Sequence, residues 1–319
     1  QSASSEKDRI QIFLQSLSGL TRLAICLLDR NAVAAVNQTL LTVEVDISLV
    51  LDLVEMMLSF PVASESTYYG TKKRLRLEPV ESGLLSPASI AGDAANHLKV
   101  LGHEILDALL SALGGPMLLP HARRITRVAY ASLLTSCSAP LRKVLDPSSA
   151  VQLDGKKRRW LHTSILVRTA AVKTLQQTVV AFGVDSSGLS GRSTGSSSKS
   201  SSDVARSIAL VGGCLIEQLS PATNSQFEAI GLGEWGSLLE RTHLTVCAAD
   251  CLSSYLVTGG EYLPIASRRL VESIAGTCLS SVLSVSSSSM PSFGLVKAAV
   301  LTFGTSCVCT PWPDGAGSS

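Results

Sequence analysis

Apolar side chains recur every three or four residues along several stretches of this chain. One stretch follows Asp46, a second covers residues 98–113 and a third covers residues 118–133. This spacing places the apolar side chains on one face of an α-helix, and Asp46 stands where an N-cap is expected. Two later stretches have the same period: Val204, Ile208, Val211, Leu215, Leu219 and Leu270, Ile274, Cys278, Val282. The pattern predicts a chain built of amphipathic helices.

The junction between the second and third stretches contains Gly114, Gly115 and Pro116. Glycine commonly ends a helix, and proline is favoured in the first turn of the next one. The sequence therefore predicts that one helix stops here and another begins. Because the junction is very short, we expect the two helices to be antiparallel neighbours.

Signals for β-structure are confined to one short alternation, Val43, Val45 and Ile47, which could begin a strand. The helical period that follows it is longer and outweighs it. No alternation of strands and helices predicts a parallel sheet. We therefore expect an all-α fold.

An internal similarity predicts how these helices are arranged. The series Ala171, Leu175, Val179, Gly183 recurs as Ala248, Leu252, Leu256, Gly260, and Ala299, Phe303, Cys307 repeats it without the final glycine. Such recurrence is typical of HEAT- or armadillo-like helix pairs, which bury their apolar faces only against neighbouring pairs. We expect an α-solenoid of such pairs with long disordered loops, and a single globular helical bundle is the alternative.

Two long segments interrupt the helical pattern. Residues 64–89 combine proline, glycine and serine with a basic cluster, and ten of the 17 residues in 186–202 are serine. A serine- and glycine-rich segment of this kind is typical of a flexible linker. The sequence therefore predicts a helical region over residues 1–185, a linker over 186–202 and a second helical region over 203–319.

The composition narrows the class of protein without identifying it. Apolar residues make up 45% of the 319 residues, charged residues 16%, and the formal net charge is +2. This excludes a wholly disordered chain and gives no general basis for a nucleic-acid or membrane surface. The eight cysteines lie mostly in apolar stretches, which favours buried thiols in a reducing compartment. Residues 10–28 are apolar but interrupted by Arg22, so neither a leader nor a membrane span is predicted there.

Motifs for enzyme chemistry lack their structural context. The glycine pattern at 231–236 resembles a dinucleotide-binding fingerprint, and the pattern at 191–195 resembles a nucleophile elbow. Both motifs work only after a β-strand, and no strand is predicted before either of them. His243, Cys247 and Cys251 would share a helix face and could bind zinc with a fourth ligand, although core packing is the favoured interpretation. We expect no cofactor, no metal and no catalytic residue. A helical enzyme whose site combines distant residues is a rival hypothesis.

Two kinds of interaction site are predicted. The leucine box Leu106, Leu109, Leu110 has the spacing that fills an apolar groove on a partner, although Leu109 also belongs to the core stripe. Two basic clusters are candidates for nuclear import or contact with RNA phosphates. These clusters are Lys72, Lys73, Arg74, Arg76 and Lys156, Lys157, Arg158, Arg159, and Arg123, Arg124 and Arg127 add positive charge on a predicted helix.

Residues 43–183 resemble the N-terminal region of the Rix-type pre-rRNA-processing family, whose animal members are called proline-, glutamate- and leucine-rich protein. The resemblance rests on the helix after Val45-Asp46-Ile47, on the leucine-rich segment 101–115, and on Leu118-Leu119-Pro120 directly after it. The charged loop 156–159 and the helix 168–175 follow in the family's order. The basic cluster at 72–76 and the serine-rich segment look like insertions, and the acidic, proline-rich tail of the animal members is missing.

This resemblance implies a non-enzymatic helical scaffold of the nucleus, in the nucleolus and nucleoplasm. Family members form a complex with a WD-repeat subunit and another helical-repeat subunit. That complex joins the pre-60S particle, supports removal of spacer RNA and helps to recruit an AAA-type remodelling ATPase. No membrane partner is implied. The alternative is a generic HEAT-type adaptor in transport, signalling or nuclear-receptor coactivation.

Overall fold

The structure, a computed structural model, describes residues 2–28, 46–59, 93–136, 165–186, 200–219, 238–260, 263–284 and 293–309. Nearly all of these residues are helical and none of them forms a strand, so the predicted all-α class is confirmed for this part of the chain. Ile47 begins a helix and not a strand. The loops that we expect to be disordered lie outside the described residues.

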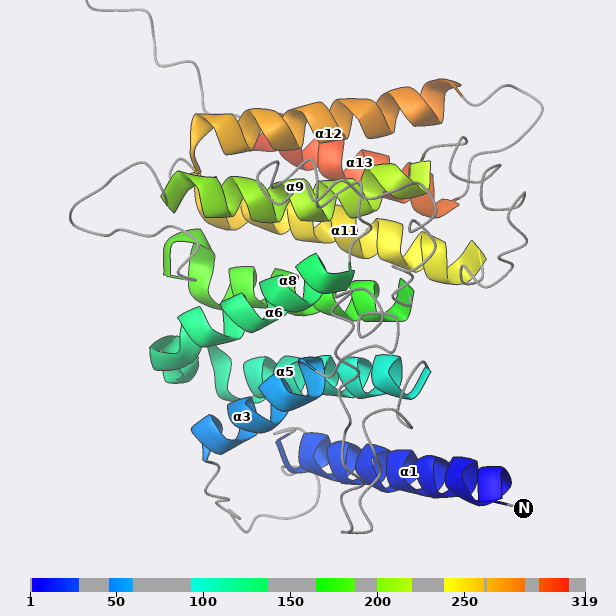
Figure 1. The fold of residues 1–319 in the computed structure, drawn as a ribbon. Helices are drawn as coiled ribbons and strands as arrows, with labels where there is room; N and C mark the ends of the chain where they lie inside the picture. The colour runs from blue at the N-terminus through cyan, green and yellow to red at the C-terminus, as the bar shows by residue number, and fades with distance from the viewer. Residues whose placement is uncertain are drawn as a thin grey trace, which may run out of the picture. The chain divides into compact units, whose positions relative to one another are not determined.

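The described helices, which Figure 1 draws as ribbons, fall into two compact units. The first unit contains α1 (Ser2–Leu28), α3 (Ile47–Leu58) and the part of α5 (Asp93–Leu118) that ends at Gly114. The second unit contains the end of α5, η1 (Leu119–His121) and the six helices α6 (Ala122–Ser136), α8 (Ile165–Ser186), α9 (Ser200–Leu219), α11 (Leu238–Gly259), α12 (Ile265–Ser284) and α13 (Phe293–Val308).

In the first unit, α3 begins as the sequence predicts. The Asp46 carboxylate accepts hydrogen bonds from the backbone N–H groups of Ser48 at 3.0 Å and Leu49 at 3.2 Å, which satisfies two donors of the first turn. Leu58 is buried at the other end of the helix, where it lies close to Gly102 of α5. A Cβ at position 102 would lie 3.1 Å from Leu58 Cδ2, so a side chain there would crowd the contact between the two helices.

The predicted helix stop after residue 113 is confirmed. Gly114 has φ 72° and ψ 170°, a conformation that interrupts α5 and that favours glycine because it lacks a Cβ. The boundary between the two units falls at the same place, between Gly114 and Gly115. The antiparallel pairing expected across this junction stays a prediction.

In the second unit, the helices pack as pairs and also as rows. The pairs are α6 with α8, α9 with α11, and α12 with α13. Across the pairs, α11 packs on α8 on one side and on α13 on the other, and α9 packs on α12 (Figure 1). Each of α8, α9, α11, α12 and α13 therefore contacts its neighbour in the chain and also a helix outside its own pair.

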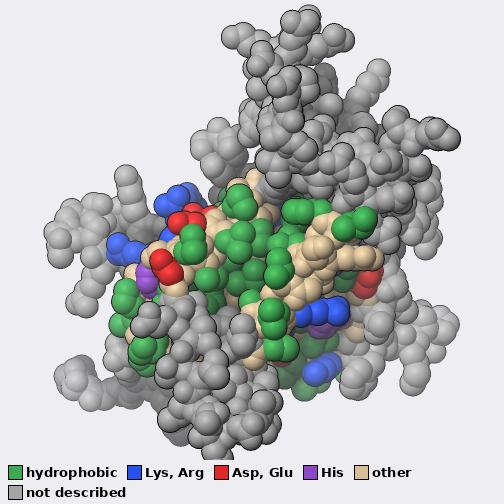
Figure 2. Space-filling model, turned by 90° about the horizontal axis from the view of Figure 1, so that it is seen from below, with side chains coloured by type: hydrophobic (Ala, Val, Ile, Leu, Met, Phe, Trp, Pro, Cys, Tyr) green, Lys and Arg blue, Asp and Glu red, His purple; other side chains and the backbone are tan. Residues whose placement is uncertain are grey.

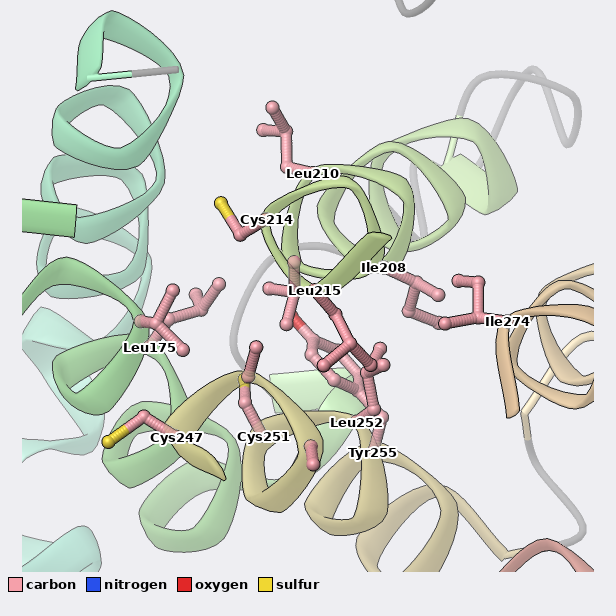
Figure 3. Close-up of a cluster of buried hydrophobic side chains, with 14 of the residues drawn as sticks. Leu175, Ile208, Leu210, Cys214, Leu215, Cys247, Cys251, Leu252, Tyr255 and Ile274 are labelled. Atoms are coloured by element: carbon pink, nitrogen blue, oxygen red, sulfur yellow. The ribbon is translucent and has the colours of Figure 1, made fainter. Parts of the chain in front are cut away.

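One continuous core connects these pairs (Figure 3). It contains Leu175 of α8, Leu215 of α9, Leu252 of α11 and Ile274 of α12. The helices before and after the serine-rich segment thus share buried side chains, and the boundary between compact units lies elsewhere, at Gly114–Gly115. Residues 187–199 of the predicted linker lie outside the described residues.

The two complete copies of the internal similarity occupy equivalent places. Ala171, Leu175 and Val179 are buried on α8, and Ala248, Leu252 and Leu256 are buried on α11, which packs against it. The glycine that ends each series has a positive φ, 72° at Gly183 and 46° at Gly260. Both series therefore provide a core stripe and a helix-ending residue, as the sequence predicts.

The third copy of the similarity was predicted wrongly in part. Ala299 of α13 is buried, but Phe303 and Cys307 are exposed. The core face of this helix carries Thr302 and Ser306 instead, and the Thr302 hydroxyl donates to the Ala298 carbonyl at 2.8 Å. These polar side chains are small and Thr302 is hydrogen-bonded within its own helix, so burial leaves its hydroxyl satisfied.

One stretch of the described chain, Ala95–Ser136, is long and apolar enough to span a membrane when judged by length and composition. Gly114 interrupts the helix in the middle of this stretch, and Leu106, Leu109 and Ile125 are fully buried inside the protein. Core helices can have the same length and composition, so this stretch does not by itself indicate a membrane span.

Candidate interaction surfaces

The N-terminal end of α6 is a positively charged surface. Arg123 and Arg127 lie one turn apart and are exposed, and Arg124 is half-buried beside them. The opposite side of the helix carries buried Ala122, Ile125, Ala129 and Leu133, which fixes the arginines toward solvent. The first turn of α6 contains no acidic residue. The exposed arginines make this side of α6 attractive to an anionic group.

The two predicted basic clusters, residues 72–76 and 156–159, lie outside the described residues. Their import or RNA-binding role stays a prediction. The α6 arginines are therefore the part of the expected basic surface that the structure places.

The leucine box lies in the core of the protein. Leu106 and Leu109 are fully buried, and Leu110 is 5% exposed. All three leucines serve packing in this conformation, as the core stripe through Leu109 suggests. A partner could reach them only after α5 left its place in the first unit.

His243, Cys247 and Cys251 do not form a metal site. His243 is exposed, whereas both cysteines are buried on α11. Cys251 points toward α9 while Cys247 points away from it (Figure 3). No group of three histidine, cysteine or acidic side chains among the described residues lies close enough to hold a metal ion. The glycine motifs at 191–195 and 231–236 lie outside the described residues.

Burial makes the core cysteines poor nucleophiles. Desolvation raises the pKa of the Cys251 thiol far above its usual value, and it raises that of Cys278 to about 11. Because the thiolate is the reactive form, both side chains are protonated and inert near neutral pH. They pack as small apolar residues, as the sequence predicts for cysteines in apolar stretches.

Polar contacts between helices were not foreseen from the sequence. Gln176 of α8 donates from Nε2 to the Ser254 hydroxyl of α11 at 3.4 Å, and that hydroxyl donates to the Asp250 carbonyl at 2.8 Å. Desolvation raises the pKa of the half-buried Asp250 carboxyl, and the nearby Lys297 of α13 acts in the opposite direction. The Gln176–Ser254 hydrogen bond joins α8 to α11, and the attraction between Lys297 and Asp250 acts between α13 and α11. No periodicity signal marks these side chains in advance.

An apolar surface on the first unit was also missed. Leu49, Leu53 and Met56 form an exposed stripe on α3, on the side away from buried Leu51 and Val54. On α1 the exposed apolar side chains are Ile12, Phe13, Leu20 and Leu23. Figure 2 shows one face of the molecule, on which hydrophobic side chains of the described residues gather. Large exposed apolar patches mark interaction sites in many proteins.

No family model, curated protein or solved structure matches this chain. The geometry of the described residues therefore carries the functional argument, together with the sequence resemblance.

Proposed function

We propose that this protein is a non-enzymatic scaffold whose helix pairs form an α-solenoid. The observation that carries this proposal is the packing of the second unit, where α8, α11 and α13 contact one another in turn and α9 contacts α12. Helical repeats pack in this way because each pair buries its apolar face only against its neighbours. Extended surfaces of such stacks suit the binding of several partners at once.

We further infer that the scaffold acts in assembly of the large ribosomal subunit and in pre-rRNA spacer processing. The support is the resemblance of residues 43–183 to the Rix-type family. The partners are then a WD-repeat subunit, a second helical-repeat subunit, an AAA-type remodelling ATPase and the pre-60S particle in the nucleus. The exposed arginines of α6 supply a surface that suits RNA phosphates.

The second candidate function is a generic HEAT-type adaptor in transport, signalling or nuclear-receptor coactivation. The same helix packing supports it, because the packing does not specify a partner. Receptor binding through the leucine box is disfavoured, since Leu106 and Leu109 are fully buried.

The test is affinity purification of the full-length protein from nuclear extract, followed by mass spectrometry and sequencing of crosslinked RNA. We expect large-subunit precursors and a WD-repeat protein among the recovered components. Recovery of trafficking or signalling proteins without either of these would favour the adaptor and overturn the ribosomal proposal.

A pair of matched variants tests the α6 surface. The double variant Arg123→Ala, Arg127→Ala should reduce the amount of recovered pre-rRNA several-fold. Each lost phosphate contact lowers the affinity for RNA and makes that affinity less dependent on salt. Arg269→Ala changes an exposed arginine on α12 and serves as the control. Equal loss from both variants would mean that general charge, and not this surface, binds RNA.

The import role of residues 156–159 has its own test. Alanine at Lys156, Lys157, Arg158 and Arg159 should leave the circular dichroism spectrum unchanged and reduce nuclear retention. Unchanged localisation would rule out this cluster as an import signal.

A further inference from the structure

Helix α13 exposes apolar residues whose equivalents on α8 and α11 are buried. The internal similarity aligns three sets of residues: Val172, Leu175, Val179 on α8; Ala249, Leu252, Leu256 on α11; and Val300, Phe303, Cys307 on α13. The first two sets are at most 1% exposed. In the third set Val300 is 66% exposed, Phe303 is 43% exposed and Cys307 is also exposed. We call this third set the end face.

The order of the helices in the second unit accounts for this difference. Helix α8 packs on α11, and α11 packs on α13, whereas no described helix follows α13 in this row. Gln176, next to Leu175 on α8, donates to Ser254 of α11, so this side of α8 faces the next helix of the row. The equivalent of Gln176 on α13 is Gly304, which is exposed. The end face is therefore the side of α13 on which a next helix would pack.

We propose that the end face of α13 binds an amphipathic helix pair of another polypeptide, which continues the row α8, α11, α13. This inference rests on the scaffold function proposed above and names one of its docking surfaces. It does not depend on the ribosomal role.

The composition of α13 differs from that of a helix that ends a stack. The terminal helices of stacked repeats carry a polar outer face, because only water covers them. Lys297 is the only charged residue of α13, and it lies near Asp250 of α11. Val308, which follows the end face, is 84% exposed. An uncharged, apolar outer side suits a further apolar stripe better than it suits water.

The length of the sequence assigns the occupant to another polypeptide. The last described pair, α12 and α13 with the segment between them, spans residues 265–308, which is 44 residues. The longest segment of this sequence outside the described residues is 60–92, which has 33 residues. None of these segments is therefore long enough to supply an equivalent pair.

A second copy of this chain fits the end face less well. Neighbours in the row meet through two different sides, because the side of α8 next to Leu175 meets the side of α11 that carries Ser254. In a two-fold dimer the end face would instead meet itself. The sides of α11 and α13 that could complete the row are already covered, by α8 and α11 of their own chain.

The first experiment places the photocrosslinker benzoylphenylalanine at position 303 of the full chain, in the cells that produce it, and identifies the crosslinked peptides by mass spectrometry. We expect crosslinks to one other polypeptide, within two successive segments that have the apolar period of a helix. The same label at position 257, an exposed valine of α11, should not capture that polypeptide. Capture from both positions would overturn the proposal, as would crosslinks to a second copy, to this chain itself, to lipid, to a segment without the helical period or to nothing.

The second experiment measures how tightly the captured polypeptide, once purified, binds the full chain. Phe303→Glu should weaken binding by about tenfold or more, because it places a charge in an apolar contact. Phe303→Leu should keep most of the affinity, and Val257→Glu, the matched control on α11, should leave it unchanged. Unchanged affinity of Phe303→Glu would overturn this docking surface. A variant that nevertheless keeps its partners would leave the scaffold proposal standing, so the two failures are distinguishable.

The rate of thiol labelling locates the contact. Cys307 belongs to the end face, whereas Cys26 lies on α1, and both thiols are exposed. The bound polypeptide should slow maleimide labelling of Cys307 several-fold and leave labelling of Cys26 unchanged. An unchanged rate at Cys307, or equal slowing at both cysteines, would contradict docking at the end face.

Discussion

The hydroxyl oxygens of Ser207 on α9 and Tyr255 on α11 lie 2.5 Å apart inside the core of the second unit. Both side chains are fully buried, and burial is the main reason that the pKa of Tyr255 is raised far above its usual value. The phenol therefore stays protonated, and the two hydroxyls satisfy one another where water is excluded. This contact joins a helix pair at the centre of the second unit.

Removing one of these hydroxyls should destabilise the protein more than removing both. Tyr255→Phe leaves the Ser207 hydroxyl buried without its partner, which costs about 1–3 kcal/mol of unfolding free energy. Adding Ser207→Ala should recover part of that loss, because no unsatisfied group remains. Urea unfolding of both single variants and the double variant measures the coupling. Strictly additive losses would mean that the hydrogen bond contributes nothing.

Arg268 should hold α13 in place. Its Nη1 donates to the Cys309 carbonyl at the end of α13 and its Nη2 to the Gly260 carbonyl at the end of α11. Both carbonyls carry the partial negative charge of a helix C-terminus. Arg268→Met should cost about 2–3 kcal/mol and speed hydrogen exchange in α13, since hydrogen bonds to charged groups are lost. Exposed Arg269→Met is the control, and equal exchange rates in the two variants would contradict this role.

Three glycines should respond differently to alanine. A Cβ at Gly115 would lie 2.1 Å from the backbone oxygen of Ala181, which cannot move without shifting α8. At Gly212 the nearest atom is the terminal Ile274 Cδ1 at 2.2 Å, and at Gly276 nothing lies within 4 Å. Gly115→Ala should therefore lower the thermal midpoint most, Gly212→Ala less, and Gly276→Ala should raise it, since alanine stabilises helices by up to about 1 kcal/mol. Calorimetry that gives any other order would contradict the packing described for these positions.

Charge in the leucine box should unfold the first unit. Leu109 is fully buried, so Leu109→Asp places a carboxylate in the core at a cost of several kcal/mol, comparable to the stability of a small domain. Met56→Asp changes a side chain that is 61% exposed and should be tolerated. Hydrogen exchange resolved to α3 and α5 reports the outcome. A Leu109→Asp protein that stays folded and loses one partner would instead identify the box as a docking site.

Acid should destabilise the first unit through His103. This side chain is fully buried on α5, and desolvation, with a smaller contribution from Lys99, lowers its pKa to about 3. In the unfolded chain its pKa is about 6.5, so the unfolded state binds more protons as the pH falls below that value. Stability should therefore decrease from about pH 6.5 toward pH 3. Unfolding curves across this range for the wild type and for His103→Leu test this, and an equally steep decrease in the variant would show that His103 is not responsible.

Local features of the fold were readable from the sequence. Asp46 caps α3, Gly114 interrupts α5, and Gly183 and Gly260 end their series with positive φ, because each of these depends on the backbone preference of one residue and its immediate neighbours. The apolar period likewise identified buried stripes such as Ile125 and Leu133. For the candidate site, the helical period located the arginines of α6 on a helix but could not show which of them face solvent.

The sequence by itself determined that the described chain is helical, where several of its helices begin and end, and which side of most helices is apolar. The tertiary structure decided which face of each helix is buried. It buries Thr302 and leaves Phe303 exposed, and it buries Leu109 while Leu23 faces outward. It also decided that Ser207 meets Tyr255 and that Arg268 bridges two helix ends. The physical reason is that backbone preference and periodicity act within a few residues, whereas burial depends on which distant helix packs against each face.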